Sequence, residues 1–227
     1  MDPLTTAGVI AVVVVSITTH EAAHGFVADR LGDPTARQAG RLTLNPIPHI
    51  DPFFTILLPL LLILSGTGVI FGGAKPVPVD ISRLHKPRRD WALVGAAGPL
   101  SNLFIAVLLA ALLSLLLHSG VLAVSSGLAE ILNVGIFVNV LLAVFNLIPI
   151  PPLDGSRVVQ YALRRNALQA YRELERYGLI LVVFLVLFFP PAQTFLVDTI
   201  FYGTEGITRV FGVWADTQPL LHHLLVG

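Results

Sequence analysis

The sequence predicts an all-α polytopic membrane protein with about five membrane segments, and its composition and apolar runs carry this prediction. Of its 227 residues, 55% are hydrophobic and only 12% are charged, whereas an average soluble domain carries about 25% charged residues. Fourteen basic and fourteen acidic residues cancel, so no net charge attracts a polyanion and nucleic acid is not an expected partner. The absence of cysteine excludes a disulfide scaffold, a thiolate nucleophile and a zinc site with Cys ligands.

Four apolar runs are long enough to cross the hydrocarbon, which takes roughly 20 residues of helix. A fifth segment, 53–71, is apolar but is interrupted by Pro59 and by Ser-Gly-Thr-Gly at 65–68. A sixth stretch, 206–226, has mixed polarity, so we expect an interfacial helix there rather than a span. The four clear runs cover residues 4–27, 91–117, 128–148 and 179–201.

The positions of Lys and Arg predict the orientation of these segments. Ten of the fourteen basic residues lie in two loops, 72–90 and 154–177, and such loops stay in the cytoplasm. The connection at 118–127 has no basic residue and is expected outside, whereas three Arg in 30–51 direct the first helix inward. Since 53–71 then joins two cytoplasmic loops, we expect it to be a re-entrant hairpin, although hydropathy alone favours a full span.

One pattern in the first run predicts chemistry, a His-Glu-Ala-Ala-His sequence that begins at His20. His20 and His24 are four residues apart and therefore share one helix face. This spacing lets two imidazoles bind one Zn²⁺, with Glu21 placed to act as general base. Ionisable residues in an apolar helix are costly and typically mark a functional site. The alternative is a helix end at the membrane interface, because Asp29 and Arg30 follow.

A catalytic zinc site needs a third protein ligand, and Asp154 is the best candidate. It follows a cluster of three prolines that breaks the helix, and Gly155 beside it adds flexibility. The alternative is an N-cap role for Asp154 in the next helix. With the first helix directed inward, His20 lies about 24 Å along that helix, near the cytoplasmic side where Asp154 is also expected.

Other polar residues are candidates for contacts near the metal. Asn102 and Asn146 are expected at the metal's depth, where they could bind substrate backbone or the oxyanion, or join helices by hydrogen bonds. Asn139 lies two turns farther away and is expected to join helices. His49 is a candidate for a fourth metal contact or a substrate-facing residue, although a structural role in its loop is the stronger expectation.

Together these segments resemble the site-2 protease family of intramembrane zinc metalloproteases, in its small prokaryotic form without PDZ or CBS domains. The pattern beginning at His20 corresponds to the family's HExxH helix. Gly98 to Asn102 resembles its GxxxN segment, and Asn146 to Gly155 resembles its NxxPxxxxDG motif. The segments 40–46 and 71–78 resemble connecting segments of small members, so the resemblance covers about residues 8–160.

The resemblance implies one zinc ion per chain, bound by His20, His24 and Asp154, with Glu21 activating the water. It also implies that Asn102 and Asn146 act near the substrate.

The implied reaction is hydrolysis of peptide bonds in or near membrane segments of other proteins, as in regulated intramembrane proteolysis. The implied partners are a substrate helix and the bilayer of a prokaryotic inner membrane, with the site toward the cytoplasm. One domain, 1–227, is expected, with its core at about 8–160; a cytoplasmic surface helix, the last span and the interfacial segment fill 161–227. Oligomeric state cannot be predicted.

Two alternatives use the same residues differently. A metal or proton transporter could use the His, Glu and Asp cluster as an ion path, but it would show inverted repeats around broken helices, and none is found. An inactive scaffold related to the proteases would lack Glu21 or a ligand, and none is missing.

Overall fold

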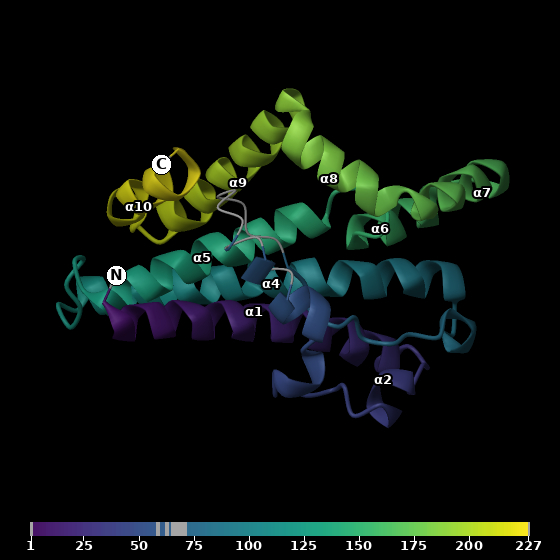
Figure 1. Ribbon diagram of the computed structural model, residues 1–227. Helices are drawn as coiled ribbons and strands as arrows, with labels where there is room; N and C mark the ends of the chain where they lie inside the picture. Colours follow the sequence, from purple (N-terminus) through teal and green to yellow (C-terminus); the bar gives the residue numbers. More distant parts are fainter. Residues whose placement is uncertain (1, 58–59, 62–63, 65–71, 227) are drawn as a thin grey trace.

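The computed structural model describes residues 2–57, 60–61, 64 and 72–226, and this part of the chain is helical and contains no strand. Three long helices lie side by side at its centre (Figure 1): α1 (Pro3–Arg30), α4 (Pro87–His118) and α5 (Gly127–Asn146). Each is long and apolar enough to cross a membrane. The all-α membrane class and three of the predicted runs are therefore confirmed.

Local sequence explains where these helices begin. The Asp2 carboxylate accepts hydrogen bonds from the N–H groups of Leu4 and Thr5, 2.9 and 3.0 Å away, at the start of α1. Ser126 caps α5 in the same way through the Ala129 N–H. These side chains satisfy N–H groups that have no partner within the first helical turn.

Small residues allow α1, α4 and α5 to pack closely, as in other membrane helix bundles. Ala106 and Ala110 of α4 are fully buried. Gly135 of α5 lies against Val12 and Leu109, and a Cβ there would approach Leu109 to 2.8 Å. The central helices are thus fixed against one another around the region that carries the polar residues.

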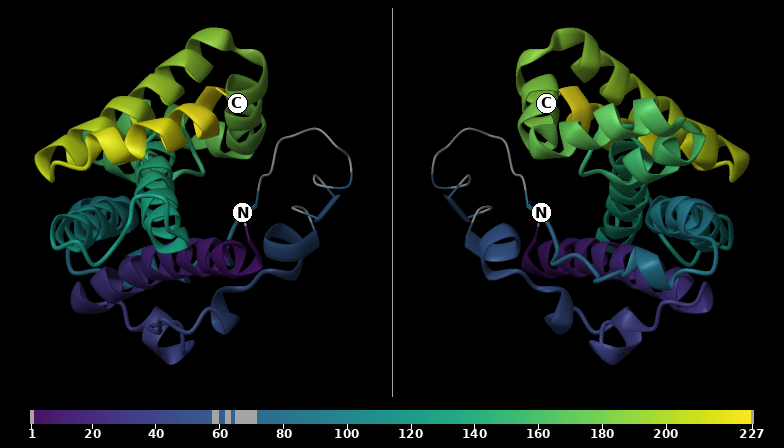
Figure 2. Two further views of the ribbon diagram at one scale, coloured as in Figure 1. Left: turned by 90° about the vertical axis from the view of Figure 1, so that its left-hand side faces the viewer. Right: turned by 90° about the vertical axis from the view of Figure 1, so that its right-hand side faces the viewer.

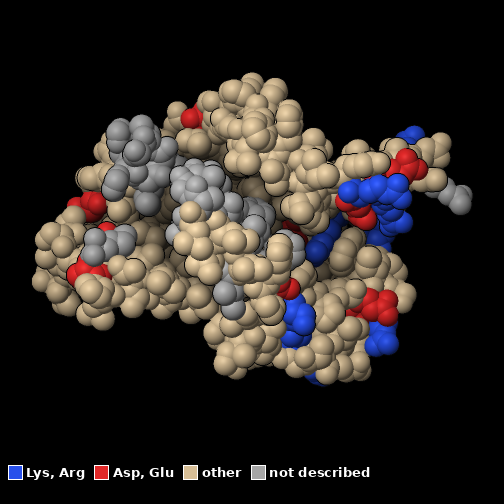
Figure 3. All heavy atoms as spheres, viewed as in Figure 1, with Lys and Arg blue, Asp and Glu red and all other residues tan. Residues whose placement is uncertain are grey.

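The two basic loops lie at the same end of the bundle. Arg88, at the start of α4, donates to the Leu163 carbonyl just after α6 (Asp154–Ala162). In Figure 3 the Lys and Arg side chains on the visible face lie in the right-hand part of the view, near α7 (Arg165–Glu173) and near α2 (Thr35–Gln38). Gly127 and Thr5 meet at the opposite end. This agrees with the expectation that both basic loops share one side of the membrane.

The run 179–201 is bent rather than straight, although its two helices together are long and apolar enough for one span. It forms α8 (Gly178–Phe188) and α9 (Pro190–Val210), which are bent by 85° relative to each other. Pro190 and Pro191 lack the N–H groups that would continue α8, and the residue before a proline avoids helical angles. The expected cytoplasmic surface helix is also divided, because Leu163 is extended between α6 and α7.

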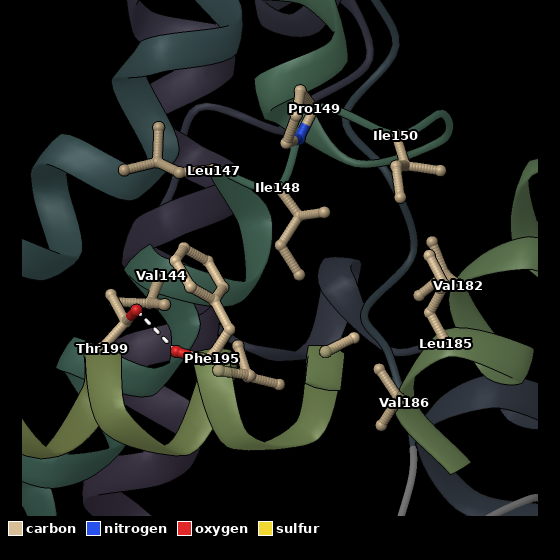
Figure 4. A pocket seen from close by; sticks show the side chains of 12 residues that line it. Val144, Leu147, Ile148, Pro149, Ile150, Val182, Leu185, Val186, Phe195 and Thr199 are labelled. Carbon is tan, nitrogen blue, oxygen red and sulfur yellow. Dashed lines mark hydrogen bonds between the residues drawn. The ribbon is translucent and has the colours of Figure 1, made fainter. Parts of the chain in front are cut away.

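The bend leaves an apolar cavity of about 430 Å³ between α5, α8 and α9 (Figure 4). Its walls include Leu147, Ile150, Val186 and Phe195. None of the predicted site residues lines it, so the cavity does not mark the chemistry.

The C-terminal segment is more deeply packed than a surface helix. Residues 206–210 complete α9, and α10 (Trp214–Val226) begins only after a turn. Val213 and Leu221 are fully buried, and the Thr217 hydroxyl donates to the Asn133 side chain of α5 across 2.8 Å. A position of α10 at the membrane interface stays a prediction.

The predicted re-entrant hairpin at 53–71 lies largely outside the described residues, but its flanks are described. Its start is a short π-helix, Pro52–Leu57. The Lys75 N–H donates to the His49 carbonyl across 2.8 Å, and the Thr55 hydroxyl donates to the Gly73 carbonyl across 2.6 Å. Since both ends meet, they favour a hairpin, which stays a prediction. Figure 2 shows α2 (Thr35–Gln38) on the side of α1 away from α8 and α9.

Candidate metal centre

Two helices bring three metal-binding side chains together. His20 and His24 lie one turn apart on α1, and Asp154 opens α6 directly after the proline cluster. Their Nε2, Nε2 and Oδ2 atoms form a triangle in which every side measures 3.1 Å. The three residues are only 6%, 4% and 5% exposed. Side chains separated by 134 residues therefore converge on one buried point.

The triangle fits a zinc ion. Ligand atoms about 2.0–2.1 Å from a tetrahedral Zn²⁺ lie about 3.3 Å from one another, close to the observed 3.1 Å. Two imidazoles and one carboxylate are also a donor set used by catalytic zinc sites. Within the described ranges, no other group of three His, Asp or Glu side chains has this geometry.

Each imidazole is oriented by a contact on its far side. His24 Nδ1 lies 2.6 Å from the Val94 carbonyl, which can only accept a hydrogen bond, so Nδ1–H donates and the Nε2 lone pair faces the centre. His20 Nδ1 lies 2.6 Å from the side-chain oxygen of Asn102. Contacts of this kind fix the tautomer and orientation of metal-binding histidines.

Asn102 is itself held in place by polar contacts. Its amide nitrogen donates to Asn139, 2.8 Å away, and to the Ser16 carbonyl, 3.4 Å away. Asn139 in turn donates to the Ser16 hydroxyl and to Gly135 of its own helix. This network joins α1, α4 and α5 and leaves the Asn102 oxygen pointing at His20.

Asp154 does not cap its helix, since α6 begins with it and Leu153 occupies the cap position. Its second oxygen, Oδ1, pairs with Arg157 across 3.2 Å, and that guanidinium lies 4.5 Å above the ring of Trp91. Burial raises the pKa of Asp154, but its contacts with the two imidazoles and the charge of Arg157 outweigh burial and bring the pKa well below its usual range. The carboxyl is therefore ionised at neutral pH, as metal binding requires.

Gly98 of α4 forms the floor beneath the two imidazoles. A Cβ at this position would lie 2.5 Å from His24 Nε2 and 2.6 Å from His20 Nε2. We expect Gly98→Ala to displace both rings and lower zinc affinity at least about 10-fold, as measured by zinc per chain after dialysis. Gly206→Ala is the matched control, because nothing lies within 4 Å of its Cβ position. Equal zinc content in both variants would contradict this close approach.

Glu21 lies next to His20 on α1 and is held by a distant segment. Its Oε2 accepts the backbone N–H of Val77 across 3.0 Å. Val77 belongs to a segment, residues 75–80, that runs along α1 and that we call the strap. A Cβ added at Gly25 would lie 3.0 Å from the Val77 side chain, so the strap lies directly against α1 beside the metal centre.

The other predicted site residues lie differently. Asn146 is partly buried, and its amide donates to Leu142 of its own helix across 3.0 Å. His49 is buried, and its Nε2 lies 3.1 Å from the Thr43 carbonyl. The structure therefore brings His20, His24, Asp154 and Asn102 together but does not bring Asn146 or His49 to them. A substrate role for Asn146 remains a prediction.

Sequence reasoning missed several contributors to this site. The Val94 carbonyl and the Val77 N–H are backbone atoms, so no residue type announces them. Arg157 was identifiable in principle, because an Asp and an Arg three residues apart on a helix can pair.

Comparisons with known proteins find a matching family and several relatives of the chain. The model of "Peptidase family M50" matches residues 117–189. "Putative zinc metalloprotease YwhC" of Bacillus subtilis is 40% identical over 216 residues, which cover 93% of both chains. "Putative zinc metalloprotease Rip2" of Mycobacterium tuberculosis is 35% identical over 195 residues, covering 84% of this chain and 71% of that protein. The Rip2 of Mycolicibacterium smegmatis is 33% identical over 189 residues, covering 82% and 70%. No solved structure matches the chain.

Proposed function

We propose, because the chain belongs to peptidase family M50, that it is an intramembrane zinc metalloprotease. The resemblance to site-2 proteases is thereby confirmed. The observation that carries the proposal is the buried 3.1 Å triangle of His20, His24 and Asp154, with Glu21 adjacent to His20 in the same helix. The reaction is hydrolysis of peptide bonds in or near membrane segments of other proteins.

The residues of this chain have distinct tasks in that reaction. A zinc ion bound by the three ligands supplies a Lewis acid that polarises a carbonyl and makes water nucleophilic near neutral pH. Glu21 accepts the proton of the attacking water and passes it to the leaving amine. Asn102 and the Val94 carbonyl orient the two imidazoles, which supports assigning Asn102 to the metal centre.

The substrate is a helix of another membrane protein that reaches the site through the bilayer. Because the carbonyls of a helix are already hydrogen-bonded, the substrate must unwind before its peptide bond is attacked. We place the site toward the cytoplasmic side of a prokaryotic inner membrane, which the basic loops at the Asp154 end of the bundle support. We also propose that the chain forms one domain, 1–227, with its core at about 8–160 and a peripheral part at 161–227.

A transporter remains the second class to test, because intramembrane His, Glu and Asp can form an ion path. The family membership does not favour it. An inactive scaffold is disfavoured as well, because Glu21 and all three candidate ligands are present.

Metal removal in proteoliposomes tests the proposal. We expect purified protein to cleave a labelled membrane peptide, to lose at least 99% of this activity (about 100-fold) after chelation, and to recover with stoichiometric zinc, since the metal supplies the Lewis acid. The same vesicles report ion flux through an enclosed dye. If the vesicles show zinc-dependent ion flux and no peptide cleavage, the protein is a transporter and not a protease.

A further inference from the structure

Arg41 is a buried charged residue that the reaction described above does not use. Only 5% of its surface is exposed. Its Nη2 donates to the Lys75 carbonyl and lies 3.4 Å from the Pro76 carbonyl and 3.5 Å from His49 Nδ1. Its Nε is buried and has no partner among the described residues. A buried donor without a partner destabilises the fold, so stability alone does not explain why an arginine stands here.

All but one of the N–H groups of the strap are engaged by the rest of the protein. The Lys75 N–H donates to the His49 carbonyl across 2.8 Å, and the Asp80 N–H donates to buried Asp33 across 2.6 Å. Between these anchors, the Val77 N–H donates to Glu21 across 3.0 Å. The other residues are Val79 and two prolines, which lack an N–H. The strap therefore has fixed points on both sides of Val77.

This arrangement holds one oxygen of Glu21 and leaves the other available. Val77 binds Oε2, while Oε1 accepts no hydrogen bond within the described part of the chain. A general base works efficiently only when its carboxylate is oriented toward the proton it removes. A backbone N–H supplies such orientation without adding a side chain that competes for the proton.

We propose that Arg41 is a positioning residue that fixes the strap so that the Val77 N–H orients Glu21. The proposal rests on the proposed function, in which Glu21 is the general base. Arg41 suits this task because its guanidinium carries several donors in one rigid plane and contacts two successive carbonyls. His49 completes the anchor through its carbonyl, which accepts the Lys75 N–H.

Proline substitution tests the contact between the strap and Glu21. Val77→Pro removes the N–H that binds Glu21, and Val79→Pro is the matched control because the Val79 N–H makes no hydrogen bond in the described residues. We expect Val77→Pro to lower kcat roughly 10- to 100-fold, the effect of one hydrogen bond to a charged group, with KM and zinc content unchanged. We expect Val79→Pro to stay within about 2-fold of wild type. Equal rates in the two variants overturn the proposal.

Arg41 is tested by a second set of variants. We expect Arg41→Gln to lower kcat about 10-fold with full zinc content and to speed amide exchange at Val77, followed by mass spectrometry of strap peptides. Arg41→Lys should restore part of kcat and part of the protection of the Val77 amide, because an ammonium group can still reach one carbonyl. Arg37→Gln is the control, since the Arg37 side chain is 68% exposed and pairs with Asp29, its one ion-pair partner among the described residues.

The outcomes separate this inference from the proposed function. If wild-type protein does not cleave, the proposed function fails, while amide exchange at Val77 still reports whether Arg41 fixes the strap. If wild type cleaves and Arg41→Gln matches Arg37→Gln in rate and exchange, the inference fails alone. Loss of zinc in proportion to activity in Arg41→Gln also overturns it, because the residue would then support only the fold. If Val77→Pro does not fold, the Arg41 variants decide.

Discussion

Purified Glu21→Gln is expected to keep one zinc per chain and to cleave a membrane peptide about 10³-fold more slowly than wild type. A positioned general base contributes roughly 10² to 10⁴ in rate, and an amide cannot accept the proton of the attacking water. Glutamine has the shape of glutamate, and its oxygen can still accept the Val77 N–H that Glu21 binds at 3.0 Å. The three candidate ligands therefore stay in place, and only the chemical step is lost.

The measurement pairs zinc content by atomic emission with single-turnover cleavage in proteoliposomes. Glu130→Gln is the matched control, because Glu130 lies in the first turn of α5 and belongs to no metal group in the described residues. It should cleave like wild type. If Glu21→Gln cleaves at the wild-type rate, Glu21 is not the general base.

Asp154→Ala is expected to lose both zinc and activity. Changing a residue that only orients a ligand typically lowers metal affinity 10- to 100-fold, so removal of a ligand should lower it more than about 100-fold. Two histidines alone do not complete the three protein ligands of a catalytic zinc site. Alanine also leaves Arg157, whose side chain is 22% exposed, without the partner it now has at 3.2 Å.

Asp154→Asn separates these two effects. The amide keeps the volume of the side chain and can still accept from Arg157, so the fold should be as stable as in wild type. A neutral amide oxygen is a weaker zinc ligand than a carboxylate, so zinc affinity should still fall. Zinc binding by Asp154→Asn and Asp154→Ala that equals wild type would show that Asp154 is no ligand.

The sequence predicted the parts of the fold that hydropathy and helical spacing control. The apolar runs predicted α1, α4 and α5, and the four-residue spacing of His20 and His24 predicted two of the proposed ligands. The 85° bend between α8 and α9 was missed, because hydropathy averages over a window and gives little weight to the paired prolines at its centre. The described flanks of 53–71 agree with the re-entrant expectation, whereas the segment itself is not described throughout.

Contacts between distant residues account for most of what the sequence could not predict. Nothing in the local sequence of Asn102 distinguishes a substrate contact from the hydrogen bond to His20, 82 residues away. The N–H of Val77 reaches Glu21 across 56 residues, and a backbone group has no residue type to search for. Asp154 could be proposed because a ligand was missing from a recognisable set and because a cluster of prolines breaks the helix just before it.

X-ray absorption at the zinc K-edge of the loaded protein tests the central claim most directly. We expect four nitrogen or oxygen ligands at about 2.0–2.2 Å from the zinc, with outer-shell scattering from two imidazoles and none from sulfur. The imidazole signal should fall by about half in His24→Ala, since one of two rings is removed. Zinc with no imidazole scattering, or a spectrum unchanged in His24→Ala, would contradict a metal bound between α1 and α6.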